Sequence, residues 1–570
     1  MIKSIIFLFS IVLILPITSF SQIVHDAEYY ILESQNGDQW SAEDSDINKK
    51  LAELKKKHGT PPNIVYILFD DQPYGSIGFP ELQKNMGYET PNINKLADDG
   101  INFTRMYSEP ACTPTRVAFL TGRHPVRNGM GLVGMPHEFS GLAGEEVTIA
   151  EVLSEAGYVT AHYGKGHLGD IEESYLHNQG FDETLFTPMN QITSLYNPMG
   201  SAAGAVLGFS PEISPEDPYK LDDPGLLPIG WVMAIDGKKG EQGKEWCGTS
   251  NECYAKMDIE SKKRTIEFIK TNAQAKKPFF VEYWPNGLNF LLPDMRKTTQ
   301  NGGKIAEFLL RLDAFVAELK KTLEEEGIAE NTLLIVMADN GPMVHDPPPG
   351  WGMTETFYRG GKGDFTEGGI RVPAIAYWPG MIQPGQLVGD IIHITDLFTT
   401  FAKIADADKY IPGDRIIDGI DQTSLLLNGD TYGRRDYVFV YQGHTLAAVV
   451  KGRYKRHLIG GDASGGATGI GADFYDLFQD PREENPHLVP LIHTQGQFNR
   501  MIFRHELMKK KYPDHESAKA IPLTGLSNAR PETLGIKDMI EKYMKLLPID
   551  INEYINYDDP SLKNSGDWGH

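Results

Sequence analysis

The chain has 570 residues, 41% of them hydrophobic, which is enough to bury a large core and predicts two domains. Its formal net charge of -23 argues against nucleic acid and anionic membrane surfaces as partners. An anionic substrate would therefore need a local cationic pocket to overcome the acidic field of the whole protein.

The first 21 residues are typical of a cleaved signal peptide. Lys3 precedes the apolar run Ile5–Ile17, and small residues before Gln22 provide a cleavage site after Ser21. The run is shorter than the ~20 residues of a membrane span and contains Pro16, so no stable membrane anchor is expected. The sequence thus predicts export, to the periplasm or as a secreted protein.

Residues 22–60 form a predicted N-terminal extension. Asp46–His58 has the pattern of a helix, with Gly59 as its stop, and two prolines then break the chain. We expect this extension to contribute packing and not chemistry.

Two predicted strands are continuous apolar runs, as parallel strands buried on both faces require, and both end in oxygen-bearing side chains. They are Asn63–Phe69, followed by Asp70 and Asp71, and Thr332–Ala338, followed by Asp339 and Asn340. In a doubly wound sheet such strand ends bind ligands, and hard oxygen donors without histidine or thiolate suit calcium or magnesium. The alternative is a solvated acidic turn at each place.

A lone cysteine, Cys112, precedes a short predicted helix. Pro114 suits a first helical position and Gly122 a stop, so unpaired N–H groups would face whatever binds beside the cysteine. Three arginines follow and favour a tetrahedral oxyanion over an apolar ligand. They are Arg116, Arg123 and Arg127. The alternative is a buried structural cysteine.

Two more strands are predicted further along the chain. Gly157–Tyr163 is followed by Lys165 and His167, and Lys277–Trp284 is the other strand. Between them, residues 186–244 are rich in Gly, Pro and Asp without clear periodicity, which predicts long loops over the mouth of the sheet.

The other two cysteines, Cys247 and Cys253, are six positions apart. In an oxidising compartment they could close a small loop disulfide, and two free thiols are an equal alternative.

The sequence pattern of the C-terminal region predicts a smaller antiparallel domain. Leu446–Lys451 and Arg453–Ile459 alternate like a hairpin. Helices are predicted near Phe498–Lys511 and Leu534–Leu546, and the acidic tail beyond them is expected to be loose.

The segment Cys112-Thr113-Pro114-Thr115-Arg116, followed by Leu120-Thr121-Gly122-Arg123, resembles the signature of the type I, formylglycine-dependent sulfatases, an arylsulfatase-like family of the alkaline phosphatase superfamily. Thr115 stands where the family has Ser or Ala. Further blocks resemble the family in the same order: residues 164–169, with Gly166 in place of an aromatic, 359–373 and 474–485. The resemblance implies an α/β fold with a large doubly wound mixed sheet sandwiched by helices, and a smaller C-terminal antiparallel sheet plus helix.

The resemblance also implies roles for individual residues. A maturation enzyme would oxidise Cys112 to formylglycine (3-oxoalanine), whose hydrate is the family's nucleophile. The family's calcium ligands fall on Asp70, Asp71, Asp339 and Asn340, together with the modified Cys112. Arg116, Lys165 and Lys362 would hold the sulfate, and His167 would contact the formylglycine hydroxyl and assist sulfate release.

One family residue is missing from this sequence. A histidine that protonates the leaving group usually follows the strand at Lys277–Trp284, and Asn289 stands in the equivalent place. An amide positions an oxygen but does not act as an acid. The proton would then come from a lysine, from water or from His345.

The sequence therefore predicts an exported hydrolase of aryl or carbohydrate sulfate monoesters that uses formylglycine and one calcium ion. The alternatives are a phosphate or phosphonate monoester hydrolase on the same fold and a non-catalytic binder of sulfated glycan. The substrate's identity and the oligomeric state are not predicted. The expected division is signal peptide 1–21, extension 22–60, catalytic domain 61–430, C-terminal subdomain 431–550 and tail 551–570.

Overall fold

The computed structural model describes residues 23–134, 139–189, 195–196, 227–228, 234–247, 251–285, 303–344, 357–460, 473–486 and 488–529, some of them by backbone alone. The predicted signal peptide, the helix Leu534–Leu546 and the tail lie outside these ranges. Of the helices within them, none has the length and apolar content needed to cross a membrane.

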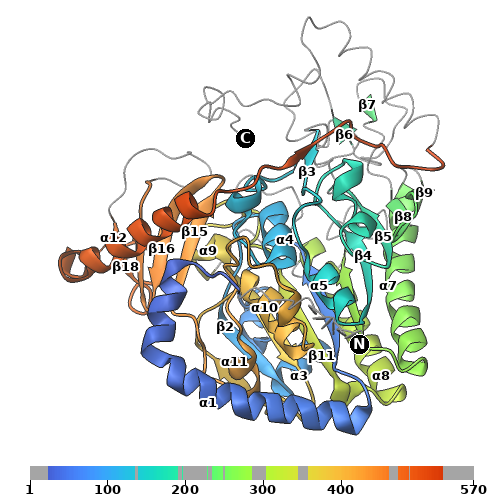
Figure 1. Cartoon of the computed structure of the whole chain (residues 1–570), viewed down its shortest axis with the longest axis horizontal. Coiled ribbons are helices and arrows are strands. Elements are labelled where there is room, and N and C mark those ends of the chain that lie inside the picture. Colours follow the sequence, from blue (N-terminus) through green and yellow to red (C-terminus); the bar gives the residue numbers. More distant parts are fainter. Residues whose placement is uncertain are drawn as a thin grey trace, which may run out of the picture.

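A mixed sheet forms the centre of the molecule (Figure 1). Its strands are β1 (Asn63–Phe69), β2 (Ile101–Tyr107), β4 (Val159–Lys165), β5 (Glu183–Thr187), β8 (Ala234–Lys238), β9 (Lys244–Cys247), β10 (Phe279–Trp284), β11 (Thr332–Ala338), β12 (Arg371–Tyr377), β13 (Gln386–Val388) and β14 (Ile392–His393). Across the described residues the order is β13-β2-β12-β11-β1-β10-β4-β5-β8-β9, with β14 also paired to β2. The central strands from β11 to β5 are parallel, so their carboxyl ends share one edge.

Side chains alternate between the two faces of this sheet, and each face has its own helices. On one face, the ring of Tyr66 lies 4.4 Å from Phe119 and 6.1 Å from Phe401. On the other, Tyr283 lies 4.6 Å from Phe315. The first layer contains α4 (Cys112–Thr121), α5 (Ile149–Glu155) and α10 (Ile394–Ile404), and the second contains α3 (Pro91–Asp98), α7 (Asn251–Gln274) and α8 (Gly303–Glu325). The predicted sheet sandwiched by helices is confirmed.

A separate antiparallel sheet follows in the chain. It has the order β15 (Tyr437–Gln442), β16 (Thr445–Lys451), β17 (Tyr454–His457) and β18 (Phe474–Asp476). Helix α12 (Leu488–Lys511) packs on it, with Phe474 and Phe498 at 4.8 Å between ring centroids. The predicted hairpin and the smaller sheet with its helix are confirmed, although α12 begins before the expected Phe498.

The N-terminal extension differs from its prediction. Helix α1 spans Ala27–His58, so it begins well before Asp46. Leu32 and Trp40 lie buried in a cluster with residues of the small sheet and α12. This long-range packing, which local periodicity does not report, explains the extra helical turns. The predicted stop is confirmed, since Gly59 is left-handed and its N–H donates to the carbonyl of Lys55 at 2.8 Å.

The prediction of loops throughout residues 186–244 is wrong in part. Strands β8 and β9 extend the main sheet, and β8 pairs antiparallel with β5, with Leu185 opposite Asp236. A short strand with Asp and Gly at its centre has no clear sequence signature and depends on its partner. The shorter elements are α2 (Pro80–Asn85), α9 (Glu367–Ile370), α11 (Thr423–Asn428), β3 (Ser140–Gly141), β6 (Leu195–Tyr196), β7 (Leu227–Pro228) and β19 (Ala518–Lys519), with 3-10 turns at Pro125–Asn128, Glu172–Ser174, Leu176–Asn178, Ala329–Asn331 and Asp408–Tyr410.

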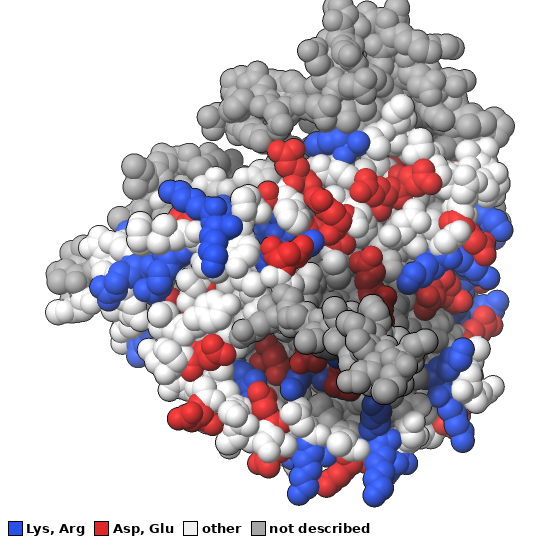
Figure 2. All heavy atoms as spheres, viewed as in Figure 1, with Lys and Arg blue, Asp and Glu red and all other residues white. Residues whose placement is uncertain are grey.

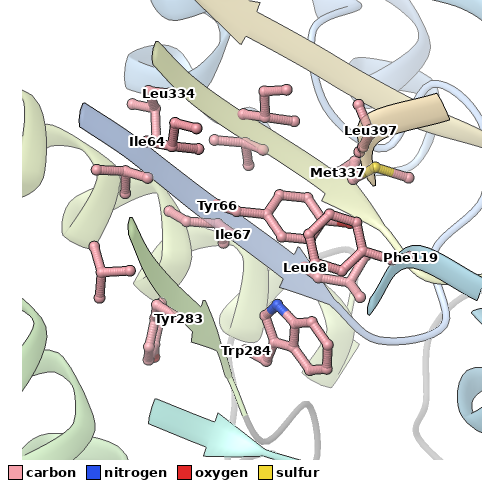
Figure 3. Packing of buried hydrophobic residues seen from close by; sticks show 14 of the residues in the cluster. Ile64, Tyr66, Ile67, Leu68, Phe119, Tyr283, Trp284, Leu334, Met337 and Leu397 are labelled. Carbon is pink, nitrogen blue, oxygen red and sulfur yellow. The ribbon is translucent and has the colours of Figure 1, made fainter. Parts of the chain in front are cut away.

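The core surrounds the central strands, and Figure 3 shows Tyr66, Phe119 and Trp284 meeting beside β1. All seven residues of β1 and of β11 are buried, as strands covered on both faces require. On the face in Figure 2, acidic and basic side chains lie interspersed. The acidic excess of the chain therefore does not exclude local cationic sites.

Candidate active site

The two acidic strand ends meet because β1 and β11 are parallel neighbours in register. Phe69 pairs with Ala338, and the N–H of Asp339 donates to the carbonyl of Phe69 at 2.9 Å. The N–H of Asp71 donates to Oδ1 of Asp339 at 3.0 Å. The structure thus brings Asp70, Asp71, Asp339 and Asn340 together at one edge of the sheet, and their role as metal ligands stays a prediction.

Asn340 is oriented so that its amide oxygen remains available. Its Nδ2 donates to Oδ1 of Asp71 and to the carbonyl of Gly341, both at 2.8 Å. Its Oδ1 is buried and has no hydrogen-bond partner among the described residues. A buried acceptor left unpaired is costly, and a cation at this position would satisfy it.

The electrostatics of the paired acids also fit a cation. Burial by itself would raise the pKa of Asp70 and of Asp339, but the net shifts of the two acids are opposite. For Asp70, the nearby Lys165 and Arg116 outweigh burial and hold the pKa below its usual range. For Asp339, burial together with the charge of Asp70 raises the pKa well above its usual range. Two such carboxylates do not both ionise readily without a further positive charge, and a divalent ion would supply it.

The cysteine lies at the start of α4, as predicted. Cys112 is a free, buried thiol at the first helical residue, and its N-cap Ala111 provides no side-chain cap. Pro114 is therefore the third helical residue and not the first. Gly122 ends the helix in the left-handed region, with its N–H donating to the carbonyl of Ala118 at 2.9 Å. The first turn of α4 lies beside the acids, because Thr115 Oγ1 donates to the carbonyl of Asp339 at 2.7 Å.

Three cations reach the acids from three different elements. Lys165, at the end of β4, places Nζ 3.0 Å from Oδ2 of Asp70. Lys362 places Nζ 2.8 Å from Oδ1 of Asp71. Arg116 on α4 contacts Asp70 and lies 2.9 Å from Oδ2 of Asp339. The site therefore gathers three cations, which the acidic chain needs locally for an anionic substrate.

Arg116 has a support that the sequence did not reveal. Its guanidinium carbon lies 4.8 Å from the ring centroid of Trp284, at the end of β10. Both side chains are fully buried. A buried guanidinium over an indole face is held by a cation–π interaction as well as by its carboxylates. Because α4 and β10 are far apart in the sequence, only the fold brings these residues together.

His167 lies beside the cysteine loop in a left-handed conformation, with φ of 62°. Its Nε2 is 3.0 Å from the carbonyl oxygen of Gly134, and the N–H of Gly134 donates to Thr113 Oγ1 at 2.9 Å. A carbonyl only accepts, so Nε2 carries the proton. Nδ1 is buried without a partner among the described residues. Burial, aided by Lys165, lowers the pKa of His167 well below 6.5, so the ring is neutral and Nδ1 is an acceptor.

Two of the predicted arginines are not in this pocket. Arg123 pairs with Glu146 at 2.5 Å, and Arg127 pairs with Asp26 at 2.9 Å and Asp418 at 2.7 Å. Their proposed role on the oxyanion is wrong, because they satisfy buried carboxylates elsewhere. Arg371, in the family block 359–373, pairs with Glu367 at 3.3 Å.

Some predicted residues lie where the structure gives no side chain. Asn289 and His345 lie outside the described residues. Cys247 at the end of β9 and Cys253 in α7 are described by backbone alone, so their disulfide stays a prediction.

Two loops of the site approach each other so closely at Gly341 that a larger residue would not fit there. A Cβ on Gly341 would lie 1.8 Å from the carbonyl oxygen of Gly368. We expect Gly341→Ala to lower the free energy of unfolding by about 1–3 kcal/mol, because backbone atoms cannot yield without moving Asn340. Calorimetry should show a lower Tm. In contrast, Gly37→Ala, where the Cβ finds ordinary space inside α1, should raise stability by about 1 kcal/mol. Equal effects of the two changes would contradict this account.

Comparison with known proteins identifies similar sequences. Residues 62–407 match the profile of the family described as Sulfatase. The N-acetylgalactosamine-6-sulfatase of Rattus norvegicus is 32% identical over 410 residues, with 70% of this chain and 71% of that protein covered. Arylsulfatase A of Homo sapiens is 33% identical over 416 residues, with 70% and 75% covered. The steryl-sulfatase of Rattus norvegicus is 30% identical over 440 residues, with 69% and 74% covered.

Solved structures share the fold. The crystal structure of PsFucS1 sulfatase from Pseudoalteromonas sp. matches with a TM-score of 0.70 and 29% sequence identity, covering 84% of this chain and 96% of that chain. Ps i-CgsB in complex with k-i-k-neocarrahexaose matches with a TM-score of 0.57 and 20% identity, covering 87% and 100%. The second likeness concerns the fold alone.

Proposed function

This chain belongs to the sulfatase family and is a sulfuric ester hydrolase, and from this premise we propose that it hydrolyses an aryl or carbohydrate sulfate monoester with formylglycine at position 112 and one calcium ion. The observation that carries the proposal is the convergence of Arg116, Lys165 and Lys362 on the acids beside the start of α4. The products are an alcohol or phenol and inorganic sulfate.

The three cations would neutralise the sulfate oxygens. Each of these side chains contacts a carboxylate in the structure. Each has a long, flexible stem, so its charged group can also donate to a sulfate oxygen of the substrate. Fixed charges in a buried site stabilise charge that develops at the reacting group more strongly than they would in water. Trp284 holds the guanidinium of Arg116 in place for this purpose.

The acid and amide oxygens of Asp70, Asp71, Asp339 and Asn340 fit a calcium ion. When present, formylglycine supplies a hydrated aldehyde as nucleophile and calcium supplies Lewis acidity. His167 would accept a hydrogen bond at Nδ1, because Nε2 is committed to Gly134. The neutral ring can therefore take a proton from the position-112 side chain and assist the release of sulfate.

The test of this proposal compares matched sulfate and phosphate monoesters of the same phenol. We expect a higher kcat/KM on the sulfate ester. A higher kcat/KM on the phosphate ester would instead indicate a phosphomonoester hydrolase. Tight binding of a sulfated glycan without turnover of either ester would indicate a binding protein.

Further parts of the proposal concern the substrate class, maturation and location of the protein. Sulfated glycans are the favoured substrates, since the relative N-acetylgalactosamine-6-sulfatase is named for a sulfated carbohydrate. A formylglycine-generating enzyme would act on Cys112, and the signal peptide at residues 1–21 would direct export. The catalytic domain would span residues 61–430 and the C-terminal subdomain residues 431–550.

A further inference from the structure

Three buried side chains behind α4 form a group distinct from the acids of the active site. Glu109 precedes α4, His124 follows it, and His393 ends β14 as the N-cap of α10. Each is at most 2% exposed. One potential ligand atom from each lies within 4.8 Å of the others.

The distances within this group suit a bound ion. Nδ1 of His124 lies 2.8 Å from Oε1 of Glu109, and Nε2 of His393 lies 3.8 Å from the same oxygen. The second distance is too long for a hydrogen bond. Ligand atoms at 2.0–2.2 Å from a tetrahedral zinc ion are about 3.3–3.5 Å apart, so the two measured separations bracket the required value.

The histidine from α10 has its ring fixed by a neighbour. Nδ1 of His393 lies 2.8 Å from Oγ1 of Thr395 and, in the N-cap of α10, accepts from the N–H of Thr395 at 3.4 Å. Nε2 is then the nitrogen that faces Glu109. These contacts orient the ring, and a metal bound at Nε2 would place the ring proton on Nδ1, where Oγ1 of Thr395 can accept it.

The charge of Glu109 also requires compensation. Among the described residues, its carboxylate has histidines as neighbours and no lysine or arginine partner. Glu109 is buried. A buried carboxylate is stable only if it is protonated, paired with a protonated histidine or bound to a cation. A bound zinc ion would provide this compensation.

We propose that Glu109, His124 and His393 hold a structural zinc ion with one water molecule. Two imidazole nitrogens and one carboxylate oxygen suit zinc better than calcium. The ion would join the loop before Cys112 to the N-terminus of α10, which packs against α4. This site would fix the position of the catalytic helix. The proposal does not depend on the chemistry at position 112.

Metal analysis of the full chain tests the proposal. Protein prepared with zinc and dialysed against excess calcium should contain about one zinc ion per chain by mass spectrometry. His393→Gln and Glu109→Gln should lower the zinc content at least tenfold and leave bound calcium unchanged. The control His505→Gln removes a buried histidine that pairs with Asp26 at 2.7 Å but lacks a second histidine, and it should retain zinc. Zinc far below one per wild-type chain, or zinc retained by His393→Gln, would overturn the proposal.

A spectroscopic measurement on the wild-type protein covers the case in which these variants fail to fold. Cobalt(II) in a four-coordinate site with imidazole ligands gives intense visible absorption bands. Cobalt bound to oxygen ligands in a six-coordinate site gives weak ones. We expect the intense bands in cobalt-loaded protein saturated with calcium, and weak bands alone would refute the assignment.

Discussion

Replacing Cys112 with alanine is expected to lower kcat for an aryl sulfate by at least about 10⁴-fold, because removing a nucleophile eliminates most of an enzyme's rate acceleration. Cys112 is small, buried and free, so alanine fits the same space at the start of α4. The Tm measured by calorimetry should change little. The measurement is turnover of a chromogenic sulfate ester by variant and wild type of equal purity.

The chemical state of Cys112 separates this explanation from a merely structural one. Mass spectrometry of the tryptic peptide Met106–Arg116 should show formylglycine in active wild-type protein, because a thiol offers no hydrated aldehyde. The matched control is Cys253→Ala, at a cysteine in α7 on the opposite face of the sheet, and it should leave kcat unchanged. Fully active enzyme with unmodified Cys112 would exclude the formylglycine mechanism.

The acidic edge of the sheet could be predicted from local sequence. Apolar runs of strand length that end in acids define β1 and β11, and parallel strands bring such ends together. The structure adds the register, in which Phe69 lies opposite Ala338, so the two acidic segments lie side by side. Lys165 and Lys362 depended more on the resemblance of their segments to family blocks, since a single lysine in a loop has many uses.

Residues brought together only by tertiary packing could not be predicted. Glu109 and His124 are 15 residues apart, and His393 joins them from another helix. Arg127 follows the cysteine helix, yet its partners are Asp26 from the extension and Asp418. The local sequence shows that an arginine is charged, but it does not show which carboxylate the arginine will pair with. The same limit explains the length of α1 and the edge strands β8 and β9, whose stability comes from distant neighbours.

Asp339→Asn is expected to weaken calcium binding and to lower kcat by at least about 100-fold at any calcium concentration reached. Asparagine keeps the shape, and its oxygen can still accept from the N–H of Asp71, which lies 3.0 Å from Oδ1 in the wild type. The change therefore removes charge more than geometry. Titration calorimetry with calcium and steady-state kinetics measure the two effects.

The pH dependence of calcium binding tests the role of Asp339 most directly. Because burial and Asp70 raise the pKa of Asp339, the metal-free site holds a proton there that calcium must displace. Affinity should therefore rise by about tenfold per pH unit below that pKa and level off above it. Asp339→Asn has no such proton, so its weaker affinity should lose this pH dependence. The control Asp313→Asn alters a buried carboxylate that bonds the start of α3, and it should keep the wild-type calcium affinity and pH profile. A wild-type affinity independent of pH, or a variant with the wild-type profile, would show that Asp339 does not hold the ion.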